Sequence, residues 1–437
     1  MSTDESISRP LRPQSAVSGG VGLAGLAGLA IWVTAAIRFG MGGPYAALAS
    51  LIACGAPMVL WSIFVDKVYR NPTTGLDWDR PPRSVAGVAD VSLIKLAGLW
   101  VTWALIAGLY CIFRFYWCGD YVFAMEVFAA TALPLLILSV PYVFWLDRRL
   151  LERRDGAWHL GAFLLGQPGV KPDQVWSHLR AWAVKGFFLA FMISIVPGSF
   201  HELVDADFTR IWGDPVALSQ WLIVSMFVVD IAFATVGYVL TMRPLDAHIR
   251  SATPYVSGWA AALICYPPFI LMGAGGPLDY HPGGQDWLYW LQHHPVLLTL
   301  TGFVLVGLTA IYAWATVAFG LRFSNLTDRG ILTHGPYAFS KHPAYLSKNL
   351  FWWVAGLPFL VTTGHPVDAI RNTALLAVVS GIYYWRAKTE EWHLSADPDY
   401  RAYAAWMERH GVITRVLTPA YWRRGERAKP PAARQGD

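Results

Sequence analysis

Two polar segments near the C-terminal end of the chain combine residue types that could bind a charged ligand. The first contains Gly335 and Tyr337 and then a short motif, Lys341-His342-Pro343-Ala344-Tyr345-Leu346. The second lies about 45 residues later and reads Arg386-Ala387-Lys388-Thr389-Glu390-Glu391. Carboxylates and aromatic rings together suit a ligand that carries a positive charge. Either segment alone could instead be the solvated, basic flank of a membrane helix, so their meeting in space decides the interpretation.

A helical hairpin must bring the two segments together. Gly335-Pro336 breaks the chain, and Pro343 suits the first turn of a helix, where its missing N–H is not needed. We therefore expect His342 at the start of a helix that continues through the apolar residues 346–362. A second apolar run, residues 366–385, then returns the chain to the surface from which it came.

The second run is expected to continue as a charged amphipathic helix over residues 386–394. Glu390 and Glu391 point about 100° apart on a helix, so one can face a pocket while the other faces elsewhere. Arg386 precedes Glu390 by four residues on one helix face and could pair with it. The hairpin therefore predicts one site built from both segments.

Composition places this site at a membrane. The chain has 437 residues, of which 55% are hydrophobic and only 14% are charged, whereas an average soluble domain carries roughly 25% charged residues. Such a low charge excludes a disordered chain and argues against a soluble domain. The four cysteines form no Cys-x-x-Cys pair, so we expect no metal site.

Ten apolar runs are candidates for membrane-spanning helices, because about 20 apolar residues cross a bilayer and backbone groups in lipid must be satisfied within the segment. The predicted fold is therefore an all-α, polytopic integral membrane bundle of about ten helices, ending in the hairpin and the amphipathic helix. The runs are residues 20–37, 44–64, 92–117, 121–145, 181–198, 217–241, 257–273, 296–320, 346–362 and 366–385.

The distribution of Lys and Arg predicts the orientation of this bundle. With ten spans, most of the 34 basic residues lie on the side of both chain termini, and basic loops stay in the cytoplasm. We therefore expect both termini and the candidate site at the cytoplasmic face, in a bacterial inner membrane. The net charge of +5 then reports orientation and does not indicate binding to nucleic acid.

Two features lie outside the C-terminal motifs. Asp230 falls in the middle of the sixth run, where a carboxylate is costly. It is a candidate functional residue, or else a hydrogen-bonded structural one.

We expect two parts in the chain, an N-terminal membrane module of unknown role over residues 1–215 and a C-terminal module over residues 216–437. The oligomeric state cannot be predicted.

The ordered C-terminal motifs resemble the isoprenylcysteine carboxyl methyltransferase family and its relatives, the phospholipid methyltransferases. Those proteins carry Gly-x-Tyr, Arg-His-Pro-x-Tyr, a helical hairpin, Arg-x-x-x-Glu-Glu and a closing Tyr-x-x-Tyr. Two positions depart from the pattern: Lys341 replaces Arg, which keeps the charge but loses the planar fork, and Ser347 stands where glycine is common. The resemblance covers roughly residues 300–416 and matches at His342, Pro343, Tyr345, Arg386, Glu390, Glu391, Tyr400 and Tyr403.

This resemblance implies an S-adenosylmethionine-dependent methyltransferase acting on a lipid or a lipidated, prenyl-type acceptor at the cytoplasmic membrane face. It implies Arg386 and Glu390 as catalytic residues. The residues implied to bind the cofactor are Gly335, Tyr337, His342, Pro343, Tyr345, Leu346, Glu390 and Glu391.

Two other functions remain open from the sequence. A membrane reductase of the sterol-reductase type would share a similar hairpin and use NADPH, although such proteins tend to have Asn at the position of Ala344. A transporter or scaffold would suit the many spans and Asp230, but no internal repeat of comparable halves is visible.

Overall fold

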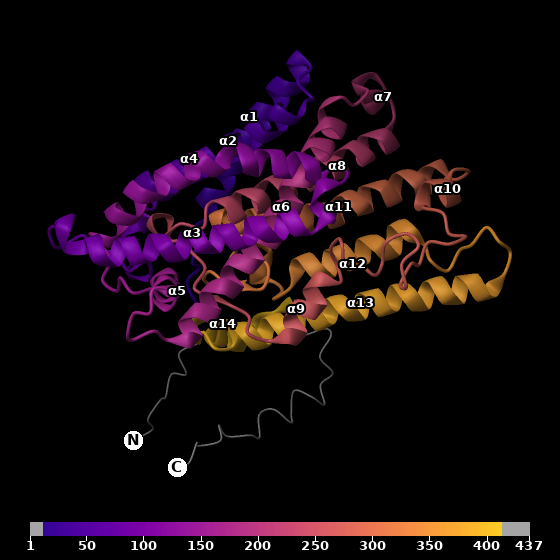
Figure 1. Ribbon diagram of the computed structural model, residues 1–437. Helices are drawn as coiled ribbons and strands as arrows, with labels where there is room; N and C mark the ends of the chain where they lie inside the picture. Colours follow the sequence, from indigo (N-terminus) through magenta and orange to yellow (C-terminus); the bar gives the residue numbers. More distant parts are fainter. Residues whose placement is uncertain (1–11, 413–437) are drawn as a thin grey trace, which may run out of the picture.

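The computed structural model describes residues 12–412, and this part of the chain folds into a bundle of helices (Figure 1). The predicted all-α membrane architecture is supported, because seven helices are long and apolar enough to cross a membrane. The chain termini, whose cytoplasmic location was expected, lie outside the described residues. The first eight helices are α1 (Gly19–Phe39), α2 (Pro44–Leu60), α3 (Ala89–Ile112), α4 (Tyr121–Asp147), α5 (Gly156–Leu164), α6 (Pro172–Val204), α7 (Phe208–Gly213) and α8 (Pro215–Val239).

The C-terminal half contains α9 to α14 and the one strand pair among the described residues. Strand β1 (Ser251–Ala252) pairs antiparallel with β2 (Thr327–Asp328). Short helical turns include η1 (Trp61–Val65), which extends α2, η7 (Gly320–Arg322) and η8 (Gly335–Ala338). The remaining helices are α9 (Val256–Leu263), α10 (Trp287–Leu291), α11 (Pro295–Phe319), α12 (Pro343–Gly356), α13 (Pro366–Leu394) and α14 (Pro398–His410).

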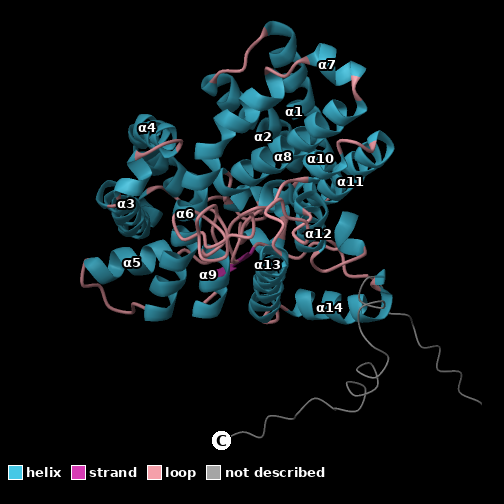
Figure 2. Cartoon of the chain, turned by 90° about the vertical axis from the view of Figure 1, so that its right-hand side faces the viewer, coloured by secondary structure: helices cyan, strands magenta, loops and turns pink. Residues whose placement is uncertain are grey.

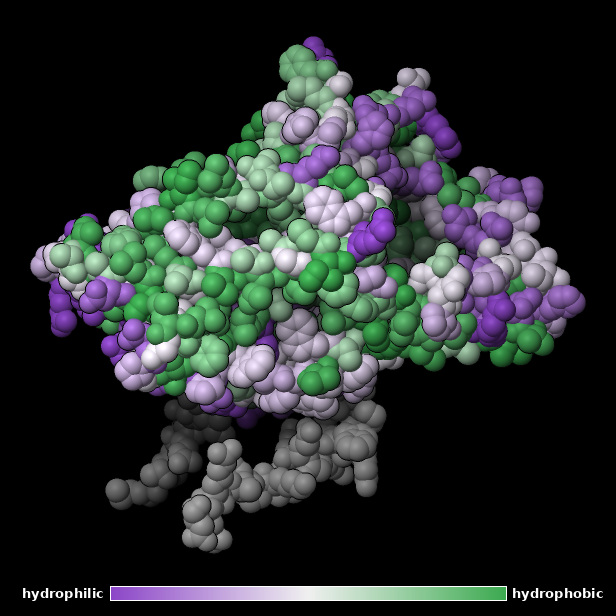
Figure 3. Space-filling view, in the orientation of Figure 1, coloured by the Kyte–Doolittle hydropathy of each residue, from purple (hydrophilic) through white to green (hydrophobic). Residues whose placement is uncertain are grey.

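Small residues let the N-terminal helices pack closely. Helix α1 lies against α2 and α11, and a Cβ atom at Gly22 would approach the carbonyl oxygen of Val317 to 2.5 Å. A Cβ atom at Gly28 would clash with the carbonyl oxygen of Ala53. Such contacts are typical of helices that associate within a bilayer. Apolar side chains cover the outer face over α3 and α4, as expected where lipid is the solvent (Figure 3).

The expected seventh span, residues 257–273, is wrong as a helix. Helix α9 has only eight residues, and the following chain up to α10 is irregular because it contains Pro267-Pro268 and several glycines. This chain runs along α13: a Cβ atom at Gly258 would lie 3.7 Å from Thr389, and Asn372 donates a hydrogen bond to the carbonyl of Pro282 at 3.0 Å.

Residues 372 to 389 of α13 span about 25 Å, so the irregular segment crosses most of the bundle without a long helix. Irregular backbone at this depth is tolerated only when protein surrounds it. Cys265 and Met272 are buried against Leu376 and Val379 of α13, and the irregular segments gather in the centre of the bundle (Figure 2). The segment is therefore an interior element of the C-terminal part.

The predicted hairpin is confirmed, although its first arm is short. Helix α12 has 14 residues, about 21 Å, which is less than the roughly 30 Å apolar core of a bilayer. Helix α13 has 29 residues and continues unbroken through the charged residues 386–394, as expected. The indole of Trp353 on α12 donates to the hydroxyl of Ser380 on α13 at 3.1 Å. Neither arm is among the seven helices that are long and apolar enough to cross a membrane, so the expected number of ten spans is not confirmed.

Candidate functional site

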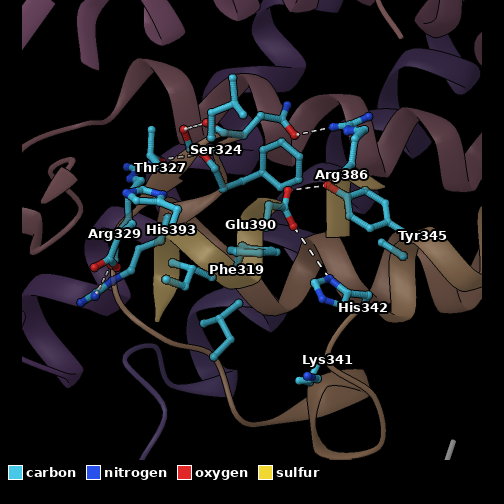
Figure 4. A pocket seen from close by; sticks show the side chains of 18 of the residues that line it. Phe319, Ser324, Thr327, Arg329, Lys341, His342, Tyr345, Arg386, Glu390 and His393 are labelled. Carbon is cyan, nitrogen blue, oxygen red and sulfur yellow. Dashed lines mark hydrogen bonds and ion pairs between the residues drawn. The ribbon is translucent and has the colours of Figure 1, made fainter. Parts of the chain in front are cut away.

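The two polar segments meet where α12 begins and α13 ends. His342 is the residue that precedes α12, and Pro343 occupies its first turn. His342 Nε2 lies 3.0 Å from Glu391 Oε1, while its Nδ1 lies 3.8 Å from Glu390 Oε2. The hydroxyl of Tyr345 donates a hydrogen bond to Glu390 Oε1. Figure 4 shows Glu390 between Tyr345 and His342, so the predicted meeting of these residues is found in the structure.

The two adjacent glutamates have different surroundings. Glu391 accepts from Lys341 Nζ and Lys388 Nζ, both at 2.9 Å, in addition to His342. Burial alone would raise the pKa of Glu391, but the hydrogen bonds from His342 and Lys341 outweigh it and hold this pKa well below its usual range. Only Glu390 lines the neighbouring cavity. The 100° offset on the helix thus separates an anchored carboxylate from one that faces a ligand space.

This cavity is partly open to the outside and is enclosed by α11, α12, α13, α14 and the segment after α11, together with Thr253 and Tyr266 on either side of α9. Five of the predicted residues line it: Tyr337, His342, Tyr345, Arg386 and Glu390. The other four predicted cofactor residues, Gly335, Pro343, Leu346 and Glu391, are not among its lining residues. Gly335 instead permits the turn η8, because its φ of +58° favours glycine.

Arg386 does not pair with Glu390, which corrects the expectation from their spacing. Its guanidinium donates to Asn325 Oδ1 at 3.3 Å and is buried. The Arg386 Cζ atom lies 5.5, 5.1 and 5.2 Å from the ring centroids of Tyr266, Tyr345 and Tyr383. Aromatic contacts and the hydrogen bond to Asn325 thus take the place of the expected ion pair, while Tyr345 donates to Glu390 Oε1.

A segment that the motif analysis missed forms one wall of the cavity. Arg329 is 3% exposed and donates to the backbone carbonyls of Gly237, Ala247, Leu321 and Phe323. Burial and the Arg322 charge lower the pKa of Arg329 to about 9, so it remains a cation at neutral pH. Arg322 pairs with Asp246 at 2.8 Å. The sequence signal was the pair of arginines directly after the eighth apolar run.

Two buried hydroxyls in this wall and in α14 have no hydrogen-bond partner among the described residues. They are Thr327 Oγ1 and the phenol of Tyr400, and both residues line the cavity. Nearby, the Tyr403 hydroxyl donates to the carbonyl of Tyr337 at 2.7 Å, which ties α14 to η8. Buried polar atoms are normally satisfied, so these two hydroxyls indicate space for a polar ligand.

His393 adds a neutral polar group to the same region. Its Nε2 atom lies 2.9 Å from the hydroxyl of Ser251. Burial, together with the charge of Arg180, lowers the pKa of His393 from 6.5 to about 4. The imidazole is therefore uncharged at pH 7. We call the part of the cavity lined by Tyr337, His342, Glu390, His393 and Tyr400 the motif end.

The opposite part of the cavity lies deeper along α11. Tyr312 precedes the end of η7 by ten residues, about 15 Å along the helix. The Tyr312 hydroxyl donates to Asp230 Oδ2 at 2.9 Å, and Thr316 donates to Oδ1, so the partners of Asp230 are now known. We call the part lined by Tyr266, Tyr312, Lys348, Tyr383 and Arg386 the deep end.

Within residues 12–412, no group of three or more His, Cys, Asp and Glu side chains could hold a metal ion. The charged groups of the site instead contact one another, aromatic rings or backbone carbonyls. In chemical terms, the motif end offers a carboxylate, hydroxyl groups and the uncharged imidazole of His393, whereas the deep end offers two cations among aromatic rings. The motif end therefore suits a ligand that carries polar and positive groups.

Comparison with known families covers this same region. The model of a family described as a protein of unknown function, DUF1295, matches residues 277–407. The match includes η8, α12, α13 and most of α14, and therefore both polar segments of the site. No curated protein and no solved structure matches the chain.

Proposed function

We propose that this protein is an integral membrane methyltransferase that uses S-adenosylmethionine to methylate a lipid or lipidated acceptor. The observation that carries the proposal is the contact of Glu390 with His342 and Tyr345 across the α12–α13 hairpin, at the wall of a cavity between apolar helices. The order of these residues resembles the isoprenylcysteine carboxyl methyltransferase family. We place the motif end at the cytoplasmic face of a bacterial inner membrane.

The motif end fits the chemistry of this cofactor. S-adenosylmethionine carries a sulfonium, an amino group, a carboxylate and ribose hydroxyls. The free phenol of Tyr400 and the hydroxyl of Thr327 can bind its polar groups, and Glu390 can bind a positive one. The three positive side chains at this end are already engaged: Arg322 by Asp246, Arg329 by backbone carbonyls and Lys341 by Glu391.

Those engaged cations also favour S-adenosylmethionine over NADPH. A dinucleotide carries several phosphates, which need unpaired cations or helix N-termini. The motif end, within the described residues, provides no cation without a partner. By this criterion of unpaired cations, the motif end suits a ligand without phosphate.

Methyl transfer requires mainly that the protein position the two reactants and exclude water from them. When bound, the cofactor supplies an activated methyl group, and the nucleophile must lie in line at about 3–3.5 Å. Arg386 is held in the deep end by Asn325 and three tyrosine rings, where it can orient an acceptor. Glu390 is fixed by Tyr345, so its carboxylate is preorganised toward the cofactor.

One observation favours a reductase as the second candidate. The phenol of Tyr312 is hydrogen-bonded to Asp230 in the deep end, and such a pair could supply the proton that reduction of a double bond requires. The same hydrogen bonds give Asp230 a structural explanation, so this carboxylate no longer favours a transporter.

Two assays separate these functions. Purified protein in membrane extracts, supplied with S-adenosylmethionine labelled in the methyl group, should transfer label to an extractable lipid or lipidated acceptor. A thermal-shift comparison should show stabilisation by S-adenosylmethionine and none by NADPH. Stabilisation by NADPH alone would reverse the assignment in favour of a reductase, and absence of any labelled product would contradict methyl transfer.

A further inference from the structure

The deep end contains a positive charge that the motif analysis did not detect. Lys348 lies on α12, half-buried, and lines the cavity. Its Nζ atom lies 5.4 Å from the ring centroid of Tyr312, 5.3 Å from that of Trp352 and 5.8 Å from that of Tyr383. The ammonium is therefore held by aromatic faces.

Arg386 enters the same space from α13. Its guanidinium lies 5.2 Å from the centroid of Tyr383, the ring that Lys348 also contacts. Within residues 12–412, the structure gives neither cation a carboxylate within ion-pair distance. Two cations thus share one aromatic wall without a direct counter-charge.

The carboxylate of Asp230 does not balance both charges. Its oxygens accept hydrogen bonds from Tyr312 and Thr316, which leaves the deep end with two positive side chains and one negative one. A buried cation is costly unless it is paired, and the imbalance is least costly when a ligand supplies one negative charge. The tyrosine and tryptophan rings around it suit an apolar chain next to that charge.

We propose that Lys348 and Arg386 bind the anionic group of an amphiphilic acceptor, so that Lys348 selects acceptors by charge. This inference rests on the proposed methyltransferase function and assigns the acceptor to the deep end, beside the cofactor at the motif end. The anionic group is a carboxylate or a phosphate, since both accept hydrogen bonds from ammonium and guanidinium groups.

An anionic acceptor also allows methyl transfer without a base, because its oxygen carries no proton that must be removed. A lone pair of the anionic oxygen forms the new bond to the methyl carbon while the sulfur–carbon bond breaks and its electron pair returns to the sulfur. The sulfonium and the anion are both neutralised, and no proton has to leave. The deep end, where the Tyr312 hydroxyl is hydrogen-bonded to Asp230, therefore needs no general base for this reaction.

Native mass spectrometry in a non-ionic detergent tests the proposal with three probes of equal chain length: palmitate, hexadecyl phosphate and hexadecanol. The protein should bind at least one of the two anions, and hexadecanol at least about tenfold more weakly, because a charge-assisted contact is lost. The stronger of palmitate and hexadecyl phosphate identifies the anion.

The variant Lys348→Met should weaken anion binding at least about tenfold and leave hexadecanol unchanged. Lys348→Arg should restore most of the affinity. A matched control is Lys185→Met, since Lys185 also contacts a tryptophan ring, at 5.0 Å, but lies outside the cavity and bonds to Thr241.

Titration with S-adenosylmethionine distinguishes failure of the anion site from failure of the proposed methyltransferase function. Lys348→Met should bind the cofactor as the wild type does, which also shows that the variant is folded. Equal anion binding by Lys348→Met and wild type, equal binding of hexadecanol and palmitate, or no anion binding by the wild type would each overturn the anion site. Anion selectivity without any cofactor binding would instead support the site and contradict the methyltransferase.

Discussion

Buried charged side chains have different partners in the N-terminal and C-terminal parts of the molecule. On α3, Lys95 Nζ lies 2.5 Å from Asp147 Oδ1 and 3.0 Å from Asp155 Oδ2, and Ser92 donates to the other oxygen of Asp147. At the end of α13, Glu390 receives one hydrogen bond from Tyr345, and its second oxygen lies 3.8 Å from His342. The first cluster is internally complete, whereas the second retains an acceptor toward a cavity.

This difference separates a structural role from a binding role. A buried ion pair whose members satisfy each other contributes to the fold and has no capacity left for a ligand. A carboxylate that is oriented by neighbours and lines a cavity can still accept hydrogen bonds. The two clusters should therefore respond to substitution in opposite ways, one in stability and the other in affinity.

The largest effect is expected in the N-terminal cluster. Lys95→Met leaves Asp147, which is fully buried, without its counter-charge and should reduce the free energy of unfolding by about 3–5 kcal/mol. Equilibrium unfolding in detergent measures this loss, and the folded fraction should bind S-adenosylmethionine with unchanged affinity. The double variant Lys95→Met, Asp147→Leu should recover much of the stability. A wild-type unfolding curve for Lys95→Met would remove the distinction between the clusters.

The next effect concerns affinity at the motif end. Glu390→Gln keeps the shape of the side chain but removes its charge and should weaken S-adenosylmethionine binding about 10–100-fold. Glu391→Gln is the matched control on the adjacent position, since Glu391 is bound by Lys341, Lys388 and His342 and does not line the cavity. Calorimetric titration measures both, and a larger loss of affinity for Glu391→Gln would contradict the assigned roles.

A pH-dependent effect of intermediate size should come from His393. The unfolded chain takes up a proton near pH 6.5, and the folded chain only near pH 4. Stability from the neutral imidazole is therefore complete above pH 6.5 and is lost as the pH falls toward 4. At pH 5 the loss is about 2 kcal/mol.

His393→Gln should remove this part of the pH dependence. Thermal unfolding at pH 7 and pH 5 measures it, with the wild type as reference, because His248 also has a lowered pKa and contributes to both proteins. Identical pH profiles for the two proteins would show that His393 is not held neutral by burial.

The smallest effect is expected at Lys341, where the chain departs from the methyltransferase motif that it resembles. Lys341→Arg restores the usual residue, and its partner Glu391 is partly exposed, so stability should change by no more than about 1 kcal/mol. The affinity for S-adenosylmethionine should stay within about threefold, because Lys341 bonds to the anchored carboxylate. A tenfold change in either direction would indicate direct contact of Lys341 with the ligand.

The sequence was sufficient to predict the hairpin and the meeting of His342 and Tyr345 with Glu390. The two apolar runs, residues 346–362 and 366–385, and the proline at the start of α12 indicate both, and these are local features of the chain. The partner of Arg386 was not predictable in this way. Its spacing from Glu390 permits a pair, but the choice of Asn325 and three rings depends on tertiary packing that no local pattern reports.

The seventh apolar run, residues 257–273, is a second feature that the sequence did not predict correctly. Hydrophobicity alone does not distinguish a spanning helix from irregular chain buried against α13, although Pro267-Pro268 and the glycines after it favoured the latter. Lys348 was missed for a related reason. It lies within an apolar run of the hairpin, and only the aromatic rings of α11 and α13 around it show that it faces the cavity.

The central claim is that the motif end binds S-adenosylmethionine, and calorimetric titration of the detergent-solubilised protein tests it most directly. The wild type should show one saturable site. The double variant His342→Ala, Glu390→Ala should lose binding by more than about 100-fold while its helix content stays unchanged. Unchanged affinity in the double variant would contradict the site, and no saturable binding by the wild type would contradict the account as a whole.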